Sequence, residues 1–401
     1  NVVIINSLFE ENQVIQKVGT GGAYGGALSM NDQWSGKINP YLWIINSRFT
    51  KNKVDHTGSN TNTHGGAIDA RSPFIMINTL IDSNSAEFSG NNGRGMGGGM
   101  MISMSSQWDG SNEIKGHIFL INNTIADNYA SSNNDNGEGG GIKINNEERV
   151  HGTWFNNIFW GNRSDDASST YNHNVRYDGG QQLQLNIDYN NIEFSEHVPD
   201  IMGSNSYDID PSFYSATNYQ LSAGSPLIGA GIATFNGITG PIFDKLENAR
   251  PNPSGSSPDL GAYENSLAES PYPKQVKNLA GIPGSGQVSL SWDANAETNI
   301  AKYVIHASTV KDFTPAREDS VGETTGTVYN VTGLANKTEY HFRVAAVNTS
   351  GYRGSFSDQL SVTPKYDGPI WWVSAEQQTN SDGSKENPFD NIMSALEQIN
   401  V

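Results

Sequence analysis

The chain has 401 residues, with 24 Lys and Arg against 42 Asp and Glu, which gives a net charge of −18. This balance argues against a nucleic-acid partner, because phosphate binding needs a basic face, and it disfavours polyanionic sugars unless a divalent cation bridges them. The sequence contains no cysteine, so no disulfide framework holds it together, and no apolar run is long enough to span a membrane. Its length allows more than one domain.

The first part of the chain repeats one pattern five times: an apolar strand-like run, an asparagine, and a second asparagine six residues later. The distance between copies varies from 32 to 44 residues, so the insertions lie outside a fixed kernel. Such a repeat predicts a β-solenoid with one coil per copy. The asparagine pairs are Asn6 and Asn12, Asn46 and Asn52, Asn78 and Asn84, Asn122 and Asn128, and Asn156 and Asn162.

The asparagines are expected to turn the chain in left-handed backbone conformations and to stack about 4.8 Å apart, linking their amides into ladders. A Gly-Gly box follows each of the first four copies, where backbone is expected to pass too close to the next coil for a Cβ. Helical solenoids are disfavoured because glycine and asparagine are poor helix formers. The boxes are placed at Gly25-Gly26, Gly65-Gly66, Gly98-Gly99 and Gly140-Gly141.

This pattern resembles the parallel β-helix repeat proteins, the superfamily that contains pectate lyases and many large bacterial surface proteins. Parallel strands joined by crossovers are almost always right-handed, so residues 1–194 are expected to form a right-handed parallel β-helix. Residues 163–194 continue it with one degenerate coil around Asn190 and Asn191.

Residues 195–268 carry several motifs, at 208–213, 219–231 and 258–264, that resemble the closing segment of secreted bacterial β-helix proteins with variable C-terminal anchors. Gly229 stands where an aspartate is common in that segment, which weakens a metal site there. We expect this segment to cap the solenoid, with Tyr263 and Leu260 covering the apolar end of the last coil.

Residues 271–364 contain alternating apolar and polar runs typical of antiparallel strands. They resemble a fibronectin type III domain, with Trp292 at the core tryptophan position and with Leu334 and Tyr340 at the tyrosine-corner spacing. Residues 365–401, with Trp371 and a helix-like run at 392–397, look like the start of a second β-helix.

The expected fold class is therefore all-β: a right-handed parallel β-helix, a fibronectin type III β-sandwich, and the truncated start of a second β-helix. The chain begins within a coil at Asn1 and ends as a new solenoid opens. Because open β-helix ends expose strand edges, we expect a fragment of a longer polypeptide with further β-helix domains on both sides.

Long loops at 13–24, 53–64, 86–97 and 129–139 leave each coil from the same kernel position and are expected to stack into one wall. The residues before the glycine boxes then form a column of Tyr24, His64, Gly97 and Gly139. Tyr24 and His64 suit the acid and base of a uronate lyase, with Arg94 neutralising the substrate carboxylate. The alternative is that Tyr24 and His64 only close the loop ends.

A two-carboxylate hydrolase is a second catalytic alternative, with Asp165 and Asp166, or Asp135 and Glu138, as candidate pairs. Acidic residues in polar loops are more often simply solvated.

No cofactor is required by the sequence, and Ca²⁺ is the candidate ligand. Residues 133–138 gather oxygen donors around a glycine, with Asp135 and Glu138 as ligands, and Asp208 with Asp210 form a second candidate pair. Ordinary polar turns with Asx hydrogen bonds are the alternative at both places.

Two loop tryptophans, Trp34 and Trp108, are candidates for stacking on sugar rings, against the alternative that they shield a neighbouring coil. The modular layout, the acidic loop wall and the lack of a convergent catalytic constellation favour an extracellular or cell-surface bacterial protein. We expect a structural or adhesive role in which the stacked loops contact polysaccharide or other surface or matrix proteins. The alternative is a polysaccharide lyase or glycoside hydrolase of the pectate-lyase-like superfamily.

Overall fold

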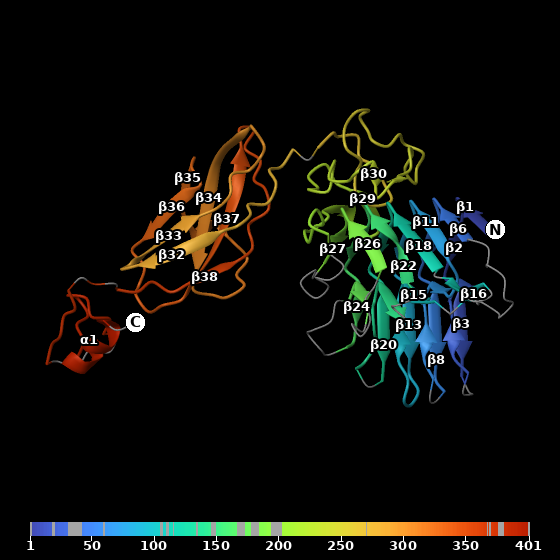
Figure 1. Ribbon diagram of the computed structural model, residues 1–401, viewed down its shortest axis with the longest axis horizontal. Coiled ribbons are helices and arrows are strands. Elements are labelled where there is room, and N and C mark those ends of the chain that lie inside the picture. Colours follow the sequence, from blue (N-terminus) through green and yellow to red (C-terminus); the bar gives the residue numbers. More distant parts are fainter. Residues whose placement is uncertain are drawn as a thin grey trace. The chain divides into compact units, whose positions relative to one another are not determined.

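The computed structural model describes residues 2–17, 21–30, 42–58, 61–104, 107–109, 112–114, 116–133, 135–145, 150–166, 173–177, 184–193, 203–269, 271–366, 368, 370–375 and 381–399. The chain divides into two compact units, Asn1–Ser270 and Pro271–Val401, and each is described by itself (Figure 1). Strands dominate both units, and helix α1 (Ile392–Ile399) lies in the second. Among these residues no helix is both long and apolar enough to cross a membrane.

The first unit consists of stacked coils whose equivalent strands pair in parallel (Figure 1). The first sheet contains β1 (Val2–Ile5), β6 (Leu42–Ile45), β11 (Phe74–Ile77), β18 (Gly116–Ile121), β22 (Val150–Phe155) and β26 (Gln184–Asp188), in that order. The second contains β2 (Leu8–Glu10), β7 (Arg48–Thr50), β12 (Leu80–Asp82), β19 (Thr124–Ala126), β23 (Ile158–Trp160) and β27 (Asn191–Ile192).

Three further parallel sheets complete the coils. The third sheet contains β3 (Gln13–Gln16), β8 (Lys53–His56), β13 (Ser85–Phe88), β20 (Tyr129–Ser132) and β24 (Arg163–Ser164). The fourth is short, with β4 (Ala23–Tyr24), β9 (Thr63–His64) and β14 (Gly95–Met96). The fifth contains β5 (Leu28–Met30), β10 (Ile68–Ala70), β15 (Met100–Ser103), β21 (Ile142–Asn145) and β25 (Val175–Arg176). Every strand pairs with its equivalents in neighbouring coils, so the predicted all-β parallel β-helix is confirmed.

The third sheet corrects one expectation about the loops. The segments that start at residues 13, 53 and 129 were expected to be loops from their first residue, but each opens with a strand of four residues that pairs with the next coil. Residues 86–97 likewise begin inside β13. These strands are short and polar, so their sequence lacks the apolar alternation that marks the first sheet.

The core is built by stacking the same coil position on itself. Ile44, Met76, Leu120 and Trp154 occupy equivalent places in the first sheet, and all are fully buried. Alternate residues of a strand face opposite sides, so these side chains fill the coil interior while their neighbours face outward. Burial of each large side chain stabilises the fold by about 1.5–3 kcal/mol.

The predicted asparagine ladder is confirmed at the second asparagine of each pair. Each Nδ2 donates to the Oδ1 of the next coil: Asn12 to Asn52 at 2.8 Å, Asn52 to Asn84 at 2.9 Å, Asn84 to Asn128 at 2.8 Å, and Asn128 to Asn162 at 2.8 Å. The first asparagines of the pairs adopt the expected left-handed conformation, with φ between 50° and 58°. Ladder bonds thus satisfy buried polar groups that the turn would otherwise leave unpaired.

The glycine boxes of the third and fourth coils lie one residue earlier than the sequence placed them. The glycines with left-handed φ are Gly25, Gly65, Gly97 and Gly139. Gly65 N donates to Met96 O at 2.9 Å, and Gly97 N donates to Glu138 O at 2.8 Å, which fixes this alignment. Each of the two later boxes is a run of three glycines, so the sequence alone leaves the frame open.

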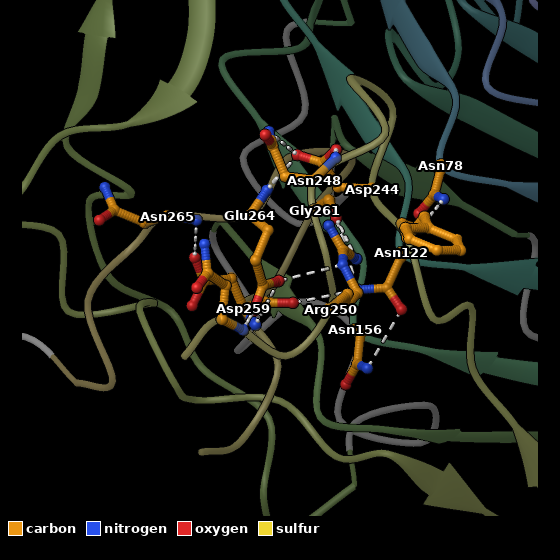
Figure 2. Close-up of polar contacts among 12 residues, drawn as sticks. Asn78, Asn122, Asn156, Asp244, Asn248, Arg250, Asp259, Gly261, Glu264 and Asn265 are labelled. Carbon is orange, nitrogen blue, oxygen red and sulfur yellow. Dashed lines mark hydrogen bonds and ion pairs between the residues drawn. The ribbon is translucent and has the colours of Figure 1, made fainter. Parts of the chain in front are cut away.

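The start of the closing segment, which is described over 203–269, stacks on the last coil: Tyr207 forms a parallel bridge with Asn191, and its carbonyl accepts the amide of Ile192 at 2.9 Å. Residues 232–264, by contrast, lie along the side of the β-helix. The first asparagines of three coils point out of the turns and donate to the backbone of these residues (Figure 2): Asn78 to Phe243 O at 2.7 Å, Asn122 to Asp259 O at 3.0 Å, and Asn156 to Ile232 O at 2.8 Å. The expectation that Tyr263 and Leu260 cap the last coil is therefore wrong. The asparagine donors recur from coil to coil, so they bind the backbone of this segment along the side of the β-helix.

The apolar contacts of this segment agree with its lateral course. Leu260 packs against Ile158 of the second sheet, and Tyr263 packs beside Leu80 and Ala126 of the same sheet. Strands β28 (Phe213–Ser215) and β29 (Asn218–Leu221) form one antiparallel hairpin, and β30 (Thr234–Phe235) and β31 (Ile238–Thr239) form another.

A buried charge cluster holds the segment in shape. Arg250 Nε lies 3.0 Å from Glu264 Oε2, and Arg250 Nη1 donates to Gly261 O at 3.0 Å (Figure 2). Asp259 accepts backbone amides from Gly229 at 2.7 Å and Asn265 at 2.6 Å. Burial, and then the neighbouring Glu264, raise the pKa of Asp259 to about 7.

The second unit contains an antiparallel sandwich. One sheet contains β32 (Ala280–Gly284), β33 (Gln287–Ser291) and β36 (Val328–Thr332); the other contains β35 (Ser320–Thr324), β34 (Ile300–Ser308), β37 (Tyr340–Asn348) and β38 (Leu360–Val362). Trp292 is buried against Tyr303, with ring centroids 5.4 Å apart. The hydroxyl of Tyr340 accepts the amide of Ala335 at 3.1 Å, as the tyrosine-corner spacing predicts.

The C-terminal part of this unit has its own small aromatic contact. Trp371 stacks on Phe389, with centroids 5.8 Å apart, and α1 follows. That this part opens a second β-helix stays a prediction.

Candidate functional site

The fourth sheet brings Tyr24 and His64 together. Tyr24 pairs with His64, His64 pairs with Met96, and Met96 forms a bridge with Glu138. The column next to the glycine boxes is therefore Tyr24, His64, Met96 and Glu138, which corrects the expected Gly97 and Gly139. The rings of Tyr24 and His64 meet edge-on with centroids 5.1 Å apart.

Two residues that the sequence reasoning missed complete this cluster. Asp69 lies on β10 and Arg71 directly follows that strand, so the turn after the glycine box delivers both beside His64. Arg71 Nε lies 3.0 Å from Asp69 Oδ2, and the Arg71 guanidinium lies 4.3 Å from the centre of the Tyr24 ring. The available signal was an aspartate inside the otherwise apolar strand Ile68–Ala70.

Burial shifts the pKa of both titratable groups at the centre of the cluster. Desolvation raises the pKa of Asp69 to about 6, although Arg71 and Ser29 act in the opposite direction. Desolvation, and then the charge of Arg71, lower the pKa of His64 to about 4. His64 Nδ1 lies 3.8 Å from Asp69 Oδ1, but the imidazole is neutral at pH 7, so the two form no ion pair there. Asp69 Oδ1 has no hydrogen-bond partner within the described residues.

A second group of charged residues, formed by Arg94, Glu138 and Lys143, lies on the next coils. Lys143 Nζ lies 2.8 Å from Glu138 Oε2, and Arg94 pairs with Glu138 Oε1. Lys143 is fully buried, whereas half of the Arg94 side chain is exposed. Both carboxylate oxygens of Glu138 are thus engaged by cations, and Arg94 is held in place.

The carboxylates named as metal or hydrolase candidates are dispersed. Asp135 is exposed in a left-handed turn, and Asp165 accepts the backbone amides of Ser132 at 2.7 Å and Gly137 at 2.6 Å. Across the described ranges, no group of three or more His, Cys, Asp and Glu gathers as a metal site. Calcium at Asp135 and Glu138 stays a prediction.

The remaining candidates lie elsewhere. Asp208 and Asp210 are exposed, and Asp210 accepts the amide of Ser212 at 2.7 Å, which is an Asx-type turn. Trp108 lies on β16 (Gln107–Asp109), which pairs with β17 (Asn112–Ile114); the structure describes its backbone but not its side chain. Trp34 lies outside the described residues.

Comparisons with known proteins match parts of the chain. A family model for the fibronectin type III domain matches residues 273–363, so these residues form a fibronectin type III β-sandwich. The amylopullulanase of Thermoanaerobacter thermohydrosulfuricus is 28% identical over 109 residues, which are 27% of this chain and 7% of the length of that relative.

Solved structures are similar to about a quarter of the chain. An Fn3-like protein from Clostridium thermocellum is 23% identical, covers 24% of this chain and 91% of its own, and has a TM-score of 0.20. The sixth fibronectin type III domain from human fibronectin type III domain containing protein 3 is 25% identical, with coverage of 24% and 91% and a TM-score of 0.21.

Proposed function

We propose that this is an extracellular multidomain protein that binds carbohydrate through the β-helix face around Tyr24 and His64, in a structural or adhesive role. The fibronectin type III domain and the similarity to an amylopullulanase, whose name describes a carbohydrate-active enzyme, support the extracellular and carbohydrate parts of this proposal.

The observation that carries the proposal is the exposed ring of Tyr24. It keeps 37% of its surface exposed while Arg71 covers one ring face and His64 contacts it edge-on. An aromatic ring held this way is preorganised, so little side-chain entropy is lost when a sugar ring packs against it. Arg71 and the half-exposed Arg94 supply hydrogen-bond donors for hydroxyl or carboxylate groups.

The test is binding of the full chain to a glycan array, followed by titration of the glycans that bind. Tyr24→Ala should weaken binding about tenfold or more, which corresponds to about 1.4 kcal/mol. Tyr214→Ala is the matched control, because Tyr214 is 75% exposed on the closing segment, away from the cluster. Equal binding by both variants would contradict the proposed face.

A polysaccharide lyase or hydrolase is the second candidate, and the raised pKa of Asp69 beside the lowered pKa of His64 favours it. Oppositely shifted neighbours are a pattern of acid–base sites. Release of unsaturated or reducing sugar ends should then fall with His64→Ala, with Tyr24→Phe and with Asp69→Asn, and the rate should change through about pH 6. Turnover that survives all three substitutions would remove this site as catalytic.

A further inference from the structure

A hollow lies on the outer face of the first sheet, on strands that carry none of Tyr24, His64, Asp69 and Arg71, which we call the Tyr24 cluster. Its volume is about 500 Å³. The floor comes from three neighbouring strands, β18, β22 and β26, and one wall comes from the hairpin β30–β31 of the closing segment. We refer to it as the β18–β26 groove. Its lining residues are His117, Phe119, His151, Gly152, Thr153, Gln184, Leu185, Asn186, Asn236 and Ile238.

The floor is ordered by the strand register. His117 pairs with His151, which pairs with Gln184, and Phe119 pairs with Thr153, which pairs with Asn186. These residues alternate along their strands and so share the outer face of the sheet. Two parallel rows therefore cross the groove, each spanning about 10 Å over three strands.

One end of the floor is a set of stacked rings. The His117 ring stacks on that of Phe119, with centroids 6.1 Å apart and planes 27° apart, and on that of His151, with centroids 5.8 Å apart and planes 30° apart. The other end carries the amides of Gln184 and Asn186. Flat rings beside short amide and hydroxyl side chains suit a ligand with one apolar face and several hydroxyl groups.

The hairpin wall is fixed by aromatic packing. Phe235 packs between Phe155 and Tyr189, at centroid distances of 5.8 and 6.1 Å. Its turn is Asn236-Gly237, with φ of 47° and 76°, and two left-handed residues make the turn type that joins two strands most tightly. This turn places Asn236 at the groove.

The charge of the lining sets the ligand class. The chain carries 42 Asp and Glu and 24 Lys and Arg, yet none of these residue types lines the groove. A cationic ligand would find no Asp or Glu and an anionic ligand no Lys or Arg among the lining residues, whereas an uncharged polyol would find aromatic faces, three amides and a threonine hydroxyl.

We propose that the β18–β26 groove binds a neutral oligosaccharide. A sugar ring packs on the surface formed by His117 and Phe119, and its hydroxyls bond Gln184, Asn186 and Asn236. The site uses none of the residues of the Tyr24 cluster, so it does not rest on the function proposed for that face.

The test is a titration of the full chain with two sets of oligosaccharides of equal length, one neutral (malto-, cello- and xylo-oligosaccharides) and one charged (oligogalacturonates). A member of the neutral set should bind with an affinity that is insensitive to salt. Phe119→Ala and Gln184→Ala should each weaken it at least about fivefold. Gln184 is exposed, so its replacement removes an amide without disturbing the core.

Two controls separate this site from the Tyr24 face. Gln13→Ala removes an exposed amide from the third sheet and should leave the affinity unchanged. Tyr24→Ala should also leave it unchanged, whatever happens at its own site. The proposal is overturned if no neutral oligosaccharide binds, if binding survives both groove substitutions, or if only the charged set binds and salt abolishes that binding.

Discussion

The asparagine ladder makes the sharpest prediction for stability, and Asn84 is a buried member that bonds the asparagines on both sides. Its Oδ1 accepts the amide of Asn52 at 2.8 Å and the Asn52 side chain at 2.9 Å. Its Nδ2 donates to Phe49 O at 2.9 Å and to Asn128 Oδ1 at 2.8 Å. Asn84 itself is 1% exposed, so water does not replace these bonds.

The cost of Asn84→Ala follows from which partners keep another bond. The Asn52 side chain still donates to Phe9 O, and Asn128 Oδ1 still accepts the Asn84 amide. The Asn52 backbone amide loses its acceptor, and such a buried orphan costs about 1–3 kcal/mol. Phe49 O also loses the hydrogen bond from the Asn84 side chain. Together, these losses should lower the free energy of unfolding of the first unit by about 2–4 kcal/mol.

Asn12 provides the matched control, because it occupies the same ladder position but is exposed and donates to Asn52 only. Asn12→Ala should cost less than about 1 kcal/mol, since Asn52 Oδ1 keeps the bond from the Asn12 backbone amide.

Guanidinium denaturation followed by circular dichroism measures both variants. The second unit has its own core, so its transition serves as an internal reference that neither substitution should move. Equal effects of Asn84→Ala and Asn12→Ala would refute the ladder argument.

Three further predictions test other parts of the chain. Arg250→Met leaves Glu264 without its cation, so unfolding of the first unit should become easier by about 3–5 kcal/mol at pH 8. The folded pKa of Asp259, about 7, lies above its ordinary value, so the native state holds a proton on this carboxyl that the unfolded chain releases. The stability that this proton contributes is full below about pH 4 and is lost as pH rises through 7. Denaturation at pH 5 and pH 8 should therefore show a smaller penalty for the variant at pH 5. Trp292→Ala should cost about 3–5 kcal/mol in the second transition and leave the first in place; a shift of the first would contradict two independent cores. If Ca²⁺ binds at Asp135 and Glu138, calcium at a hundredfold its Kd stabilises the fold by about 2.7 kcal/mol, and a chelator should lower the melting temperature of the first unit; identical melting curves would remove calcium.

The sequence by itself determined the coil. The constant spacing of six residues between paired asparagines predicted the parallel strands, the left-handed turns and the ladder, because all three depend on contacts between equivalent positions of neighbouring coils. It also predicted the neighbourhood of Tyr24 and His64, since the residue before a glycine box repeats in every coil. Trp292 and Tyr340 marked the second unit for the same reason: their roles are set by local spacing.

Only the tertiary structure decided which residues of neighbouring coils meet and which segment packs against the coils. The frame of the triple-glycine boxes was settled by hydrogen bonds from Gly65 and Gly97 to the next coil, and this replaced Gly139 with Glu138 in the column. Asp69 entered the site because the turn after the box brings it beside His64, and its pKa is raised because that place is buried.

The course of the closing segment depended on contacts across more than a hundred residues, such as Asn122 with Asp259. Local patterns carry no information about such pairs, because the donors are properties of the coil and the acceptors are backbone carbonyls that every residue possesses. The β18–β26 groove needs that course as well: its floor is set by the repeat, but its wall exists because Phe235 docks on the first sheet.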